Sequence, residues 1–352
     1  MRALIQKAIA RGTREARARG ILRVRKDANC LNWAIVGTGY MASVWADLLL
    51  ASNTGRLHAV CSRSPEKAAG FGRKFGCKRG FGDLAQMLSE EGAGLDFVYV
   101  ATPLETHRDI IENCIAAGVN VLTEKPATPT SEKWAELAAM AKERGVLLIE
   151  GMWMLCLPTF GQADDWIAEG AIGEVQSVEA NLNKYQPQSE TGVLMDYGVY
   201  ALAFARHFLG GTPDQVSSHG RNAPEGHDTA WEIDAARAGR TATIKLSANS
   251  HEPSIARVTG TGGSIEWASP FNRASAVTLR RLGSGGEEVR RFAYRHQGFE
   301  YQLAEATRCQ RLGMEESPLI SHSITRDTLR FAEQVRAGAD RDGPRTSRTN
   351  GG

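Results

Sequence analysis

The chain has 352 residues, 42% of them hydrophobic and 23% charged, which is enough for two domains with separate cores. It contains no apolar run near the roughly 20 residues that span a bilayer, so no membrane association is expected. Six scattered cysteines form no C-x-x-C pair, and the eight histidines form no ligand motif. This usage favours a cytoplasmic protein with reduced thiols and no metal site.

The start of the chain is strongly basic. Residues 1–30 hold nine Lys or Arg against two acidic residues, a net charge of +7, which leaves −5 for the rest. An Arg-rich start is compatible with a targeting peptide or a nucleic-acid arm, but it lacks the apolar core or serine richness of such peptides. We expect a helical extension over 1–31 that touches a partner subunit. The acidic remainder predicts no nucleic-acid partner.

Residues 32–150 alternate short apolar runs with helical patterns. The apolar runs lack polar alternation, as expected for parallel strands that are covered on both faces. We predict strands at 33–36, 57–61, 96–100, 119–122 and 146–149, with helices at 41–51, 65–75, 106–117 and 131–142. This order predicts an α/β domain with a doubly wound parallel sheet.

Residues 151–337 have a different pattern. Residues 241–248 alternate polar and apolar side chains, which is typical of a sheet with one solvated face. We predict strands at 175–183, 230–236, 241–248 and 255–259, with helices at 160–169, 299–312 and 323–337. The pattern predicts an α+β domain with a large, mostly antiparallel open sheet. The Gly- and Arg-rich tail, 338–352, is predicted to be disordered.

A glycine-rich turn follows the first strand. Gly37 allows a tight turn, Gly39 lets the backbone approach a pyrophosphate, and Ala42 permits close helix–strand packing. Thr38, Tyr40 and Met41 complete the start of the helix, whose free N–H groups suit phosphate oxygens. The alternative is an ordinary tight turn. Its position at the head of a strand–helix series favours a dinucleotide-binding Rossmann domain over 32–150.

The end of the second strand bears on cofactor choice. NAD-binding domains place an acidic residue there for the ribose 2′-hydroxyl. This chain has Ser62 and Arg63, with Lys67 one helical turn later. Because a guanidinium can pair with a 2′-phosphate through two hydrogen bonds, the segment favours NADP over NAD. The alternative is an exposed polar loop that selects neither.

Glu124, Lys125 and Pro126 follow the fifth strand. Ligands of open α/β sheets bind at the carboxyl ends of the strands, so Lys125 stands where chemistry is expected. Taken alone, such a Glu-Lys pair is more often a surface ion pair than a catalytic unit.

From about residue 32 to 337 the chain resembles the Gfo/Idh/MocA oxidoreductase family. The resemblance rests on the glycine turn and on four later motifs, which are Ala101-Thr102-Pro103 with His107, Glu124-Lys125-Pro126, Gly192 to Tyr200, and Gly260 to Gly263. The segments from Tyr301 to Pro318 are most similar to its dihydrodiol dehydrogenase and NADP-dependent D-xylose dehydrogenase branch.

The resemblance implies roles for individual residues. Lys125 would stabilise charge on the reacting oxygen, and Tyr200 would act as general acid/base. Asp196, four residues before Tyr200 and on the same helix face, would orient Lys125 and Tyr200. Without the resemblance, Tyr200 is interpretable as a core tyrosine and Asp196 as a helix N-cap.

The remaining positions that the resemblance assigns to the cofactor site lie in the first domain or just after it. They are Thr102, Pro103, His107, Glu124, Lys125 (in addition to its catalytic role) and Trp153. His107 has the alternative of a residue that only begins a helix.

Two departures from the family pattern stand out. Leu155 occupies a position where the family usually has an arginine that helps to fix cofactor and substrate. The segment 183–190 is shorter than the family's usual loop, which suggests a more open cleft. Lys184 and Tyr185 within it are candidate substrate contacts or a solvated strand end.

We therefore expect an NAD(P)-dependent oxidoreductase that transfers a hydride between nicotinamide and a sugar, polyol or sugar derivative, including small diols. A non-catalytic, cofactor-binding regulatory protein on the same fold is the alternative. The family resemblance further implies a homodimer or homotetramer formed through the sheet of the second domain.

Overall fold

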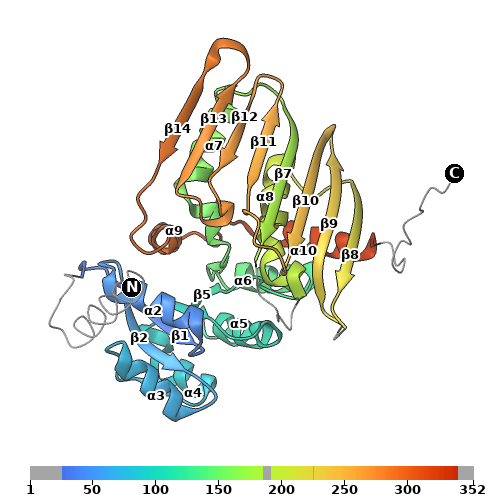
Figure 1. Ribbon diagram of the computed structural model, residues 1–352. Helices are drawn as coiled ribbons and strands as arrows, with labels where there is room; N and C mark the ends of the chain where they lie inside the picture. The colour runs from blue at the N-terminus through green and yellow to red at the C-terminus, as the bar shows by residue number, and fades with distance from the viewer. Residues whose placement is uncertain (1–25, 185–191, 225, 340–352) are drawn as a thin grey trace, which may run out of the picture. The chain divides into compact units, whose positions relative to one another are not determined.

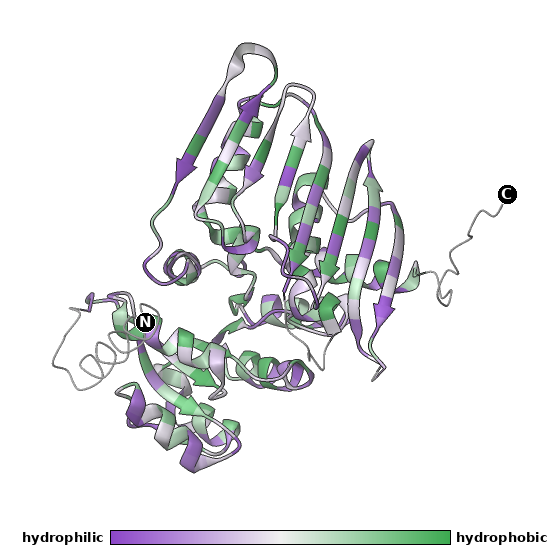
Figure 2. Ribbon diagram, viewed as in Figure 1, coloured by the Kyte–Doolittle hydropathy of each residue, from purple (hydrophilic) through white to green (hydrophobic). Residues whose placement is uncertain are grey.

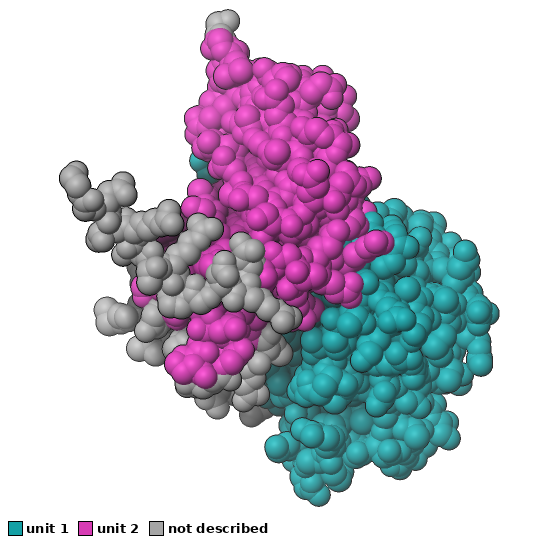
Figure 3. All heavy atoms as spheres, turned by 90° about the vertical axis from the view of Figure 1, so that its right-hand side faces the viewer, with its two compact units in different colours: residues 1–165, 290–329 teal, residues 166–289, 330–352 magenta. Residues whose placement is uncertain are grey.

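The computed structural model describes residues 26–184, 192–224 and 226–339 (Figure 1). Most of the predicted N-terminal extension and C-terminal tail lie outside these residues. The chain forms two compact units, residues 1–165 with 290–329, and residues 166–289 with 330–352 (Figure 3). Residues 290–329 pack with the first unit, whereas the sequence pattern placed them in the second domain.

The first unit contains a six-stranded parallel sheet in the order β3-β2-β1-β4-β5-β6. Its strands are β1 (Leu31–Val36), β2 (Gly55–Cys61), β3 (Gly80–Phe81), β4 (Phe97–Val100), β5 (Asn120–Thr123) and β6 (Leu148–Glu150). The strand order reverses between β1 and β4, which is the topology of a doubly wound dinucleotide-binding sheet. The predicted α/β class is confirmed.

Helices connect these strands. They are α2 (Tyr40–Ala51), α3 (Pro65–Lys74), α4 (Leu84–Glu91), α5 (His107–Ala116) and α6 (Ser131–Glu143), and α9 (Phe299–Arg311) completes the unit from the far end of the chain. The sequence pattern missed β3 and α4 because a two-residue strand and an eight-residue helix present too little periodicity.

Aromatic packing fixes β1 at the centre of this sheet. The fully buried rings of Trp33 and Phe97 are stacked with centroids 4.3 Å apart. Trp45 of α2 contacts Trp33 edge-on and stacks on Tyr99 of β4. These contacts hold β1, β4 and α2 together beside the glycine turn.

Lys26 satisfies the carboxyl end of α2. Its ammonium donates to the backbone oxygens of Leu49, Ser52 and Gly55 at 2.8, 2.5 and 2.9 Å. A cation at a helix C-terminus is favoured by the helix dipole and by the unpaired carbonyl groups there.

The second unit contains an eight-stranded sheet in the order β14-β13-β12-β11-β7-β10-β9-β8. Its strands are β7 (Val175–Asn183), β8 (Gln215–Asn222), β9 (Asp228–Arg237), β10 (Arg240–Ser247), β11 (Ala256–Gly260), β12 (Gly263–Trp267), β13 (Ala276–Arg281) and β14 (Glu287–Arg291). Only β7 and β10 pair in parallel among the pairs whose register is defined, so the predicted mostly antiparallel sheet is confirmed.

The hydropathy of these strands alternates along β7, β9, β10 and β11 (Figure 2). The helix α8 (Val199–Leu209) covers the apolar side of β7 and β10. The apolar side chains of α8 include Phe204, whose ring meets Trp267 edge-on. Strands β8 and β14 escaped prediction because they are mostly polar.

Three elements contain a boundary between the units. These are α7 (Pro158–Ala168), β14 and α10 (His322–Ala337). No helix in the described part of the chain is both long and apolar enough to cross a membrane.

Candidate functional site

The glycine turn after β1 is built by two glycines with different surroundings. Gly37 has φ +110°, and a Cβ placed there would lie 2.3 Å from the backbone oxygen of Ala101. Gly39 is the N-cap of α2, and a Cβ there would meet no heavy atom of the described chain within 4 Å. Gly37 therefore permits close approach of the loops after β1 and β4, and Gly39 leaves open space in front of the helix.

A pocket of about 550 Å³ lies at this turn, a volume typical of cofactor sites. Eight of the residues predicted to bind the cofactor line it, namely Gly37, Thr38, Gly39, Ser62, Arg63, Lys67, Thr102 and Pro103. These residues follow β1, β2 and β4, so the pocket lies at the carboxyl ends of strands on both sides of the point where the strand order reverses.

The edge of the pocket after β2 is mainly cationic. Arg63 and Lys67 are exposed there, and Ser64 caps α3 by accepting a hydrogen bond from the Lys67 N–H at 3.2 Å. The Ser64 hydroxyl donates to Glu66 at 2.7 Å, and this hydrogen bond lowers the pKa of the Glu66 carboxyl. The edge thus offers two cations and a helix N-terminus to an anion, with one carboxylate beside them.

The sequence pattern missed the pocket wall contributed by the loop between β3 and α4. Gly82, Asp83 and Leu84 line the pocket there. Asp83 caps α4 by accepting a hydrogen bond from the Gln86 N–H at 2.7 Å. The Gly-Asp pair ahead of a helix was the available signal.

Lys125 stands at the end of β5 in a constrained loop. The peptide bond between Lys125 and Pro126 is cis, and the Lys125 side chain is half-buried. The Glu124 carboxylate accepts hydrogen bonds from the Tyr99 hydroxyl and from the Lys125 N–H. Burial raises the pKa of Glu124, and these hydrogen bonds and the Lys125 charge oppose the rise. This environment differs from that of a solvated surface ion pair.

His107 is the first residue of α5 and is buried below the pocket. Its ring nitrogens lie 2.9 Å from the Thr102 oxygen and 3.2 Å from the Ala127 oxygen. Burial lowers the pKa of His107, and a neutral imidazole can donate to only one of these two oxygens. His107 thus connects the loops after β4 and β5 without lining the pocket.

The other predicted cofactor residues lie around the pocket rather than in its lining. Tyr40 is 76% exposed at the start of α2, and Met41 follows it half-buried. Trp153 is buried and stacks on Phe299 with ring centroids 4.4 Å apart. Leu155 is also buried, as its apolar side chain requires.

In the second unit, Asp196 and Tyr200 lie on a helix that begins with an unusual turn. Residues Leu194–Gly198 form a π-helix, a form often found at functional sites, and α8 follows it. Asp228 supports this turn by accepting hydrogen bonds from the Leu194 N–H at 2.7 Å and the Trp231 indole at 2.8 Å. Asp196 is half-buried inside the turn, and Gly198 is the N-cap of α8, so Asp196 is not a helix cap.

Two tyrosines, Tyr197 within this turn and Tyr200 at the start of α8, have different surroundings. Tyr200 is 7% exposed. The Tyr197 hydroxyl is buried with no hydrogen-bond partner among the described residues, and burial, followed by the charges of Asp196 and Asp228, raises its pKa. The Lys184 ammonium lies 5.4 Å from the Tyr197 ring centroid. Tyr185 and residues 186–190 are outside the described residues.

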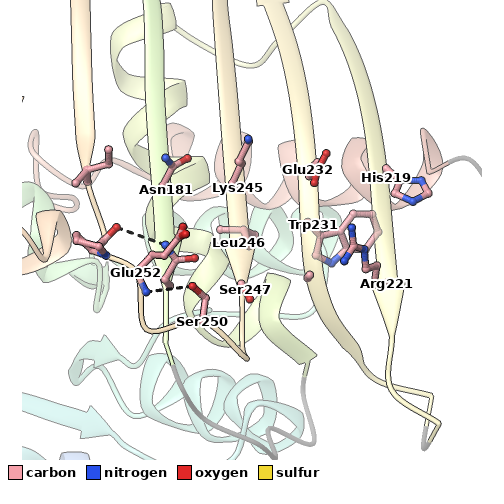
Figure 4. Close-up of a pocket in the computed structure, with 14 residues that line it drawn as sticks. Asn181, His219, Arg221, Trp231, Glu232, Lys245, Leu246, Ser247, Ser250 and Glu252 are labelled. Carbon is pink, nitrogen blue, oxygen red and sulfur yellow. Dashed lines mark hydrogen bonds between the residues drawn. The ribbon is translucent and has the colours of Figure 1, made fainter. Parts of the chain in front are cut away.

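A second pocket, of about 530 Å³, lies on the sheet of this unit (Figure 4). Asn181, Lys245, Glu232 and His219 form a row across β7, β10, β9 and β8 in the figure. The lining combines charged residues of both signs with apolar side chains such as Trp231, Leu246 and Ile255. No group of three or more His, Cys, Asp or Glu suited to a metal ion occurs in the described ranges.

Comparison with known proteins agrees with this architecture. Residues 31–152 match the model of the oxidoreductase family with an NAD-binding Rossmann fold, and residues 160–266 match the Gfo/Idh/MocA C-terminal domain. A trans-1,2-dihydrobenzene-1,2-diol dehydrogenase from Oryctolagus cuniculus is 25% identical over 319 residues, covering 86% of this chain and 96% of its own.

Two further similarities concern reductases. A dTDP-3,4-didehydro-2,6-dideoxy-alpha-D-glucose 3-reductase from Streptomyces antibioticus is 34% identical over 46% of this chain and 51% of its own. A 3-ketoreductase from Actinomadura kijaniata, solved in complex with TDP-benzene and NADP, has a TM-score of 0.76 and 25% identity. That alignment covers 88% of this chain and 98% of the ketoreductase.

An aldose-aldose oxidoreductase from Caulobacter crescentus shares the fold with a TM-score of 0.78 and 23% identity, over 88% of this chain and 97% of its own. Together with the two domain matches, the glycine turn and its pocket, these similarities establish that the chain belongs to the Gfo/Idh/MocA family of NAD(P)-binding oxidoreductases.

Proposed function

We propose that this enzyme transfers a hydride between C4 of a nicotinamide cofactor and a carbon of a sugar, polyol or sugar derivative. The observation that carries the proposal is the glycine-turn pocket, with Lys125 at the end of β5 in the same unit. Relatives named as a diol dehydrogenase and a sugar 3-reductase support this substrate class.

The residues around the pocket suit the two ends of the cofactor. Open space at Gly39 and the uncapped start of α2 fit a pyrophosphate, and Thr102 and Pro103 fit the nicotinamide side. A bound nicotinamide supplies the hydride chemistry. The positive charge of Lys125 would stabilise the alkoxide that develops on the substrate oxygen. Tyr200 would give the substrate hydroxyl its proton or take it, and Asp196 would orient Lys125 and Tyr200.

Replacing the hydroxyl of Tyr200 tests the proton step. We expect Tyr200→Phe to lower kcat by about 10²–10⁴-fold, the usual range for general acid–base catalysis, with unchanged NADPH affinity. A panel of sugars and diols, followed through nicotinamide absorbance, identifies the substrate for the comparison. Tyr197→Phe is the matched control because its hydroxyl has no partner among the described residues, and it should retain activity within a few-fold. Equal losses in both variants would contradict the assignment.

We propose that the cofactor is NADP(H) rather than NAD(H), because Ser62, Arg63 and Lys67 line the pocket after β2. A 2′-phosphate bound there would lose charge-assisted hydrogen bonds in Arg63→Ala. Losing one such bond costs about 1.5–3 kcal/mol, so we expect NADPH to bind at least about 10- to 100-fold more weakly and NADH to bind unchanged.

Nicotinamide fluorescence titration measures both affinities. Arg73→Ala, on the last turn of α3 and outside the pocket lining, is the control and should leave both affinities unchanged. A parallel loss of NADH and NADPH affinity in Arg63→Ala would overturn the phosphate assignment.

Two further proposals concern assembly and location. We propose a homodimer or homotetramer formed through the second-unit sheet, because its polar face presents a pocket across four strands (Figure 4). The mass of the protein in solution tests this. A cytoplasmic location is supported by the six cysteines, which are all free and mostly buried.

A further inference from the structure

The loop that carries Lys125 is held at one residue, Ala127, by hydrogen bonds to both its N–H and its carbonyl oxygen. Two residues after Lys125, the Ala127 N–H donates to the Glu150 carboxylate at 3.0 Å, and the Ala127 oxygen faces the His107 ring at 3.2 Å. Ala127 is fully buried. These hydrogen bonds therefore hold the backbone two residues after Lys125.

Glu150 reaches this loop from the adjacent strand. It is the last residue of β6, which pairs with β5 so that Glu150 lies opposite Thr123. Its side chain is 2% exposed, and its second oxygen accepts a hydrogen bond from the Thr325 hydroxyl of α10 at 3.0 Å. Thr325 is itself fully buried. Both carboxylate oxygens are thus bound to donors of the first unit.

The charges that face Glu150 come from the Lys125 loop. Burial raises the pKa of Glu150 to about 7, and the Glu124 charge raises it too. The hydrogen bonds from Ala127 and Thr325 and the positive charge of Lys125 act in the opposite direction. A glutamine would accept from Ala127 and donate to the Thr325 oxygen without a buried charge, so hydrogen bonding alone does not require a glutamate here.

We propose that Glu150 is a positioning residue for Lys125, which fixes the Ala127 amide and attracts the Lys125 ammonium through its negative charge. This inference rests on the proposed function, in which Lys125 acts on the substrate oxygen. A misplaced ammonium would stabilise the developing alkoxide less well, so Glu150 should affect kcat and leave cofactor binding unchanged.

The test compares Glu150→Gln with the wild type from pH 5.5 to 8.5. At pH 8.5, where the wild-type Glu150 is ionised, kcat of the variant should be about 10- to 100-fold lower, as for a small misplacement of a catalytic group. At pH 5.5, where Glu150 is mostly protonated, the two enzymes should differ by no more than about fourfold. NADPH affinity should be equal throughout. Dividing the kcat of the wild type by that of the variant at each pH removes the pH dependence that comes from groups present in both enzymes.

A second pair of variants keeps the test independent of the glutamine substitution. Thr325→Val removes a donor that favours the ionised carboxylate, so it should raise the pKa of Glu150. The kcat of Thr325→Val divided by that of Glu150→Gln should therefore change with pH around a midpoint about one pH unit higher than the same ratio for the wild type. Thr328→Val is the control, because this buried threonine donates to Ile324 of its own helix instead.

The possible failures are distinguishable. A wild-type enzyme without turnover on any sugar or diol would overturn the proposed function and this role with it. Turnover by the wild type with a Glu150→Gln ratio that stays constant with pH, or with weakened NADPH binding, would overturn only the positioning role.

Discussion

Replacing Lys125 by methionine is expected to lower kcat/KM by about 10²–10³-fold, the effect of removing one preorganised group that stabilises an oxyanion. Methionine keeps the unbranched apolar stem of lysine and removes the ammonium group, with its charge and its hydrogen-bond donors. The loop should therefore keep its backbone hydrogen bonds at Ala127. NADPH affinity should change by less than a few-fold, because the lining of the glycine-turn pocket lies outside this loop.

Steady-state rates with the best substrate of the sugar and diol panel, combined with NADPH titration, measure this. Lys133→Met is the control, since Lys133 is exposed near the start of α6. A Lys125→Met enzyme with near wild-type kcat/KM would show that electrostatic stabilisation of the substrate oxygen comes from another group. Loss of NADPH binding alone would place Lys125 in cofactor binding.

Gly37→Ala is expected to have the largest effect on stability. The new Cβ would lie 2.3 Å from the Ala101 oxygen at φ +110°, and Ala101 is held by its own hydrogen bond to Val36 at 2.9 Å. Backbone strain and overpacking each destabilise by about 1–3 kcal/mol, so the free energy of unfolding should fall by about 2–5 kcal/mol. Relief of the clash would shift the loops after β1 and β4, and NADPH should bind at least tenfold more weakly.

Gly39→Ala separates the effect on stability from the effect on NADPH binding. Its φ of −79° suits alanine, and no heavy atom of the described chain lies within 4 Å of the new Cβ. The free energy of unfolding should fall by only about 0.5–1 kcal/mol, because alanine is a poorer N-cap residue than glycine. NADPH affinity should still fall, because the Cβ would occupy the space proposed for the pyrophosphate. Urea unfolding and fluorescence titration of both variants measure the two effects, and unchanged stability of Gly37→Ala would contradict the steric argument.

Much of the fold could be predicted because its strands are long or strongly apolar. Strand β7 was predicted with its observed bounds, and β1, β4 and β5 within two residues at either end. Local pattern failed where an element was short, as for β3, or polar, as for β8. The packing of residues 290–329 against the first unit depends on tertiary contacts such as the Trp153–Phe299 stack, which no local pattern encodes.

One part of the candidate site could likewise be predicted from the sequence, and another part could not. The pocket lining was predictable because residues such as Gly37 and Arg63 directly follow the ends of parallel strands. The contact that holds the Lys125 loop could not be predicted, because Glu150 is an isolated acidic residue in the sequence. Its role becomes visible only when Thr325, 175 residues later, donates to its carboxylate. The resemblance assigned His107 to the cofactor, whereas its ring contacts only became clear from the structure.

Titration of the wild-type protein with NADPH and NADH, followed by nicotinamide fluorescence, tests cofactor binding without any knowledge of the substrate. We expect saturable binding at micromolar concentrations, with NADPH binding more tightly than NADH. A folded protein that binds neither nucleotide below about 1 mM, equivalent to a binding free energy weaker than about −4 kcal/mol, could not act as an NAD(P)-dependent oxidoreductase.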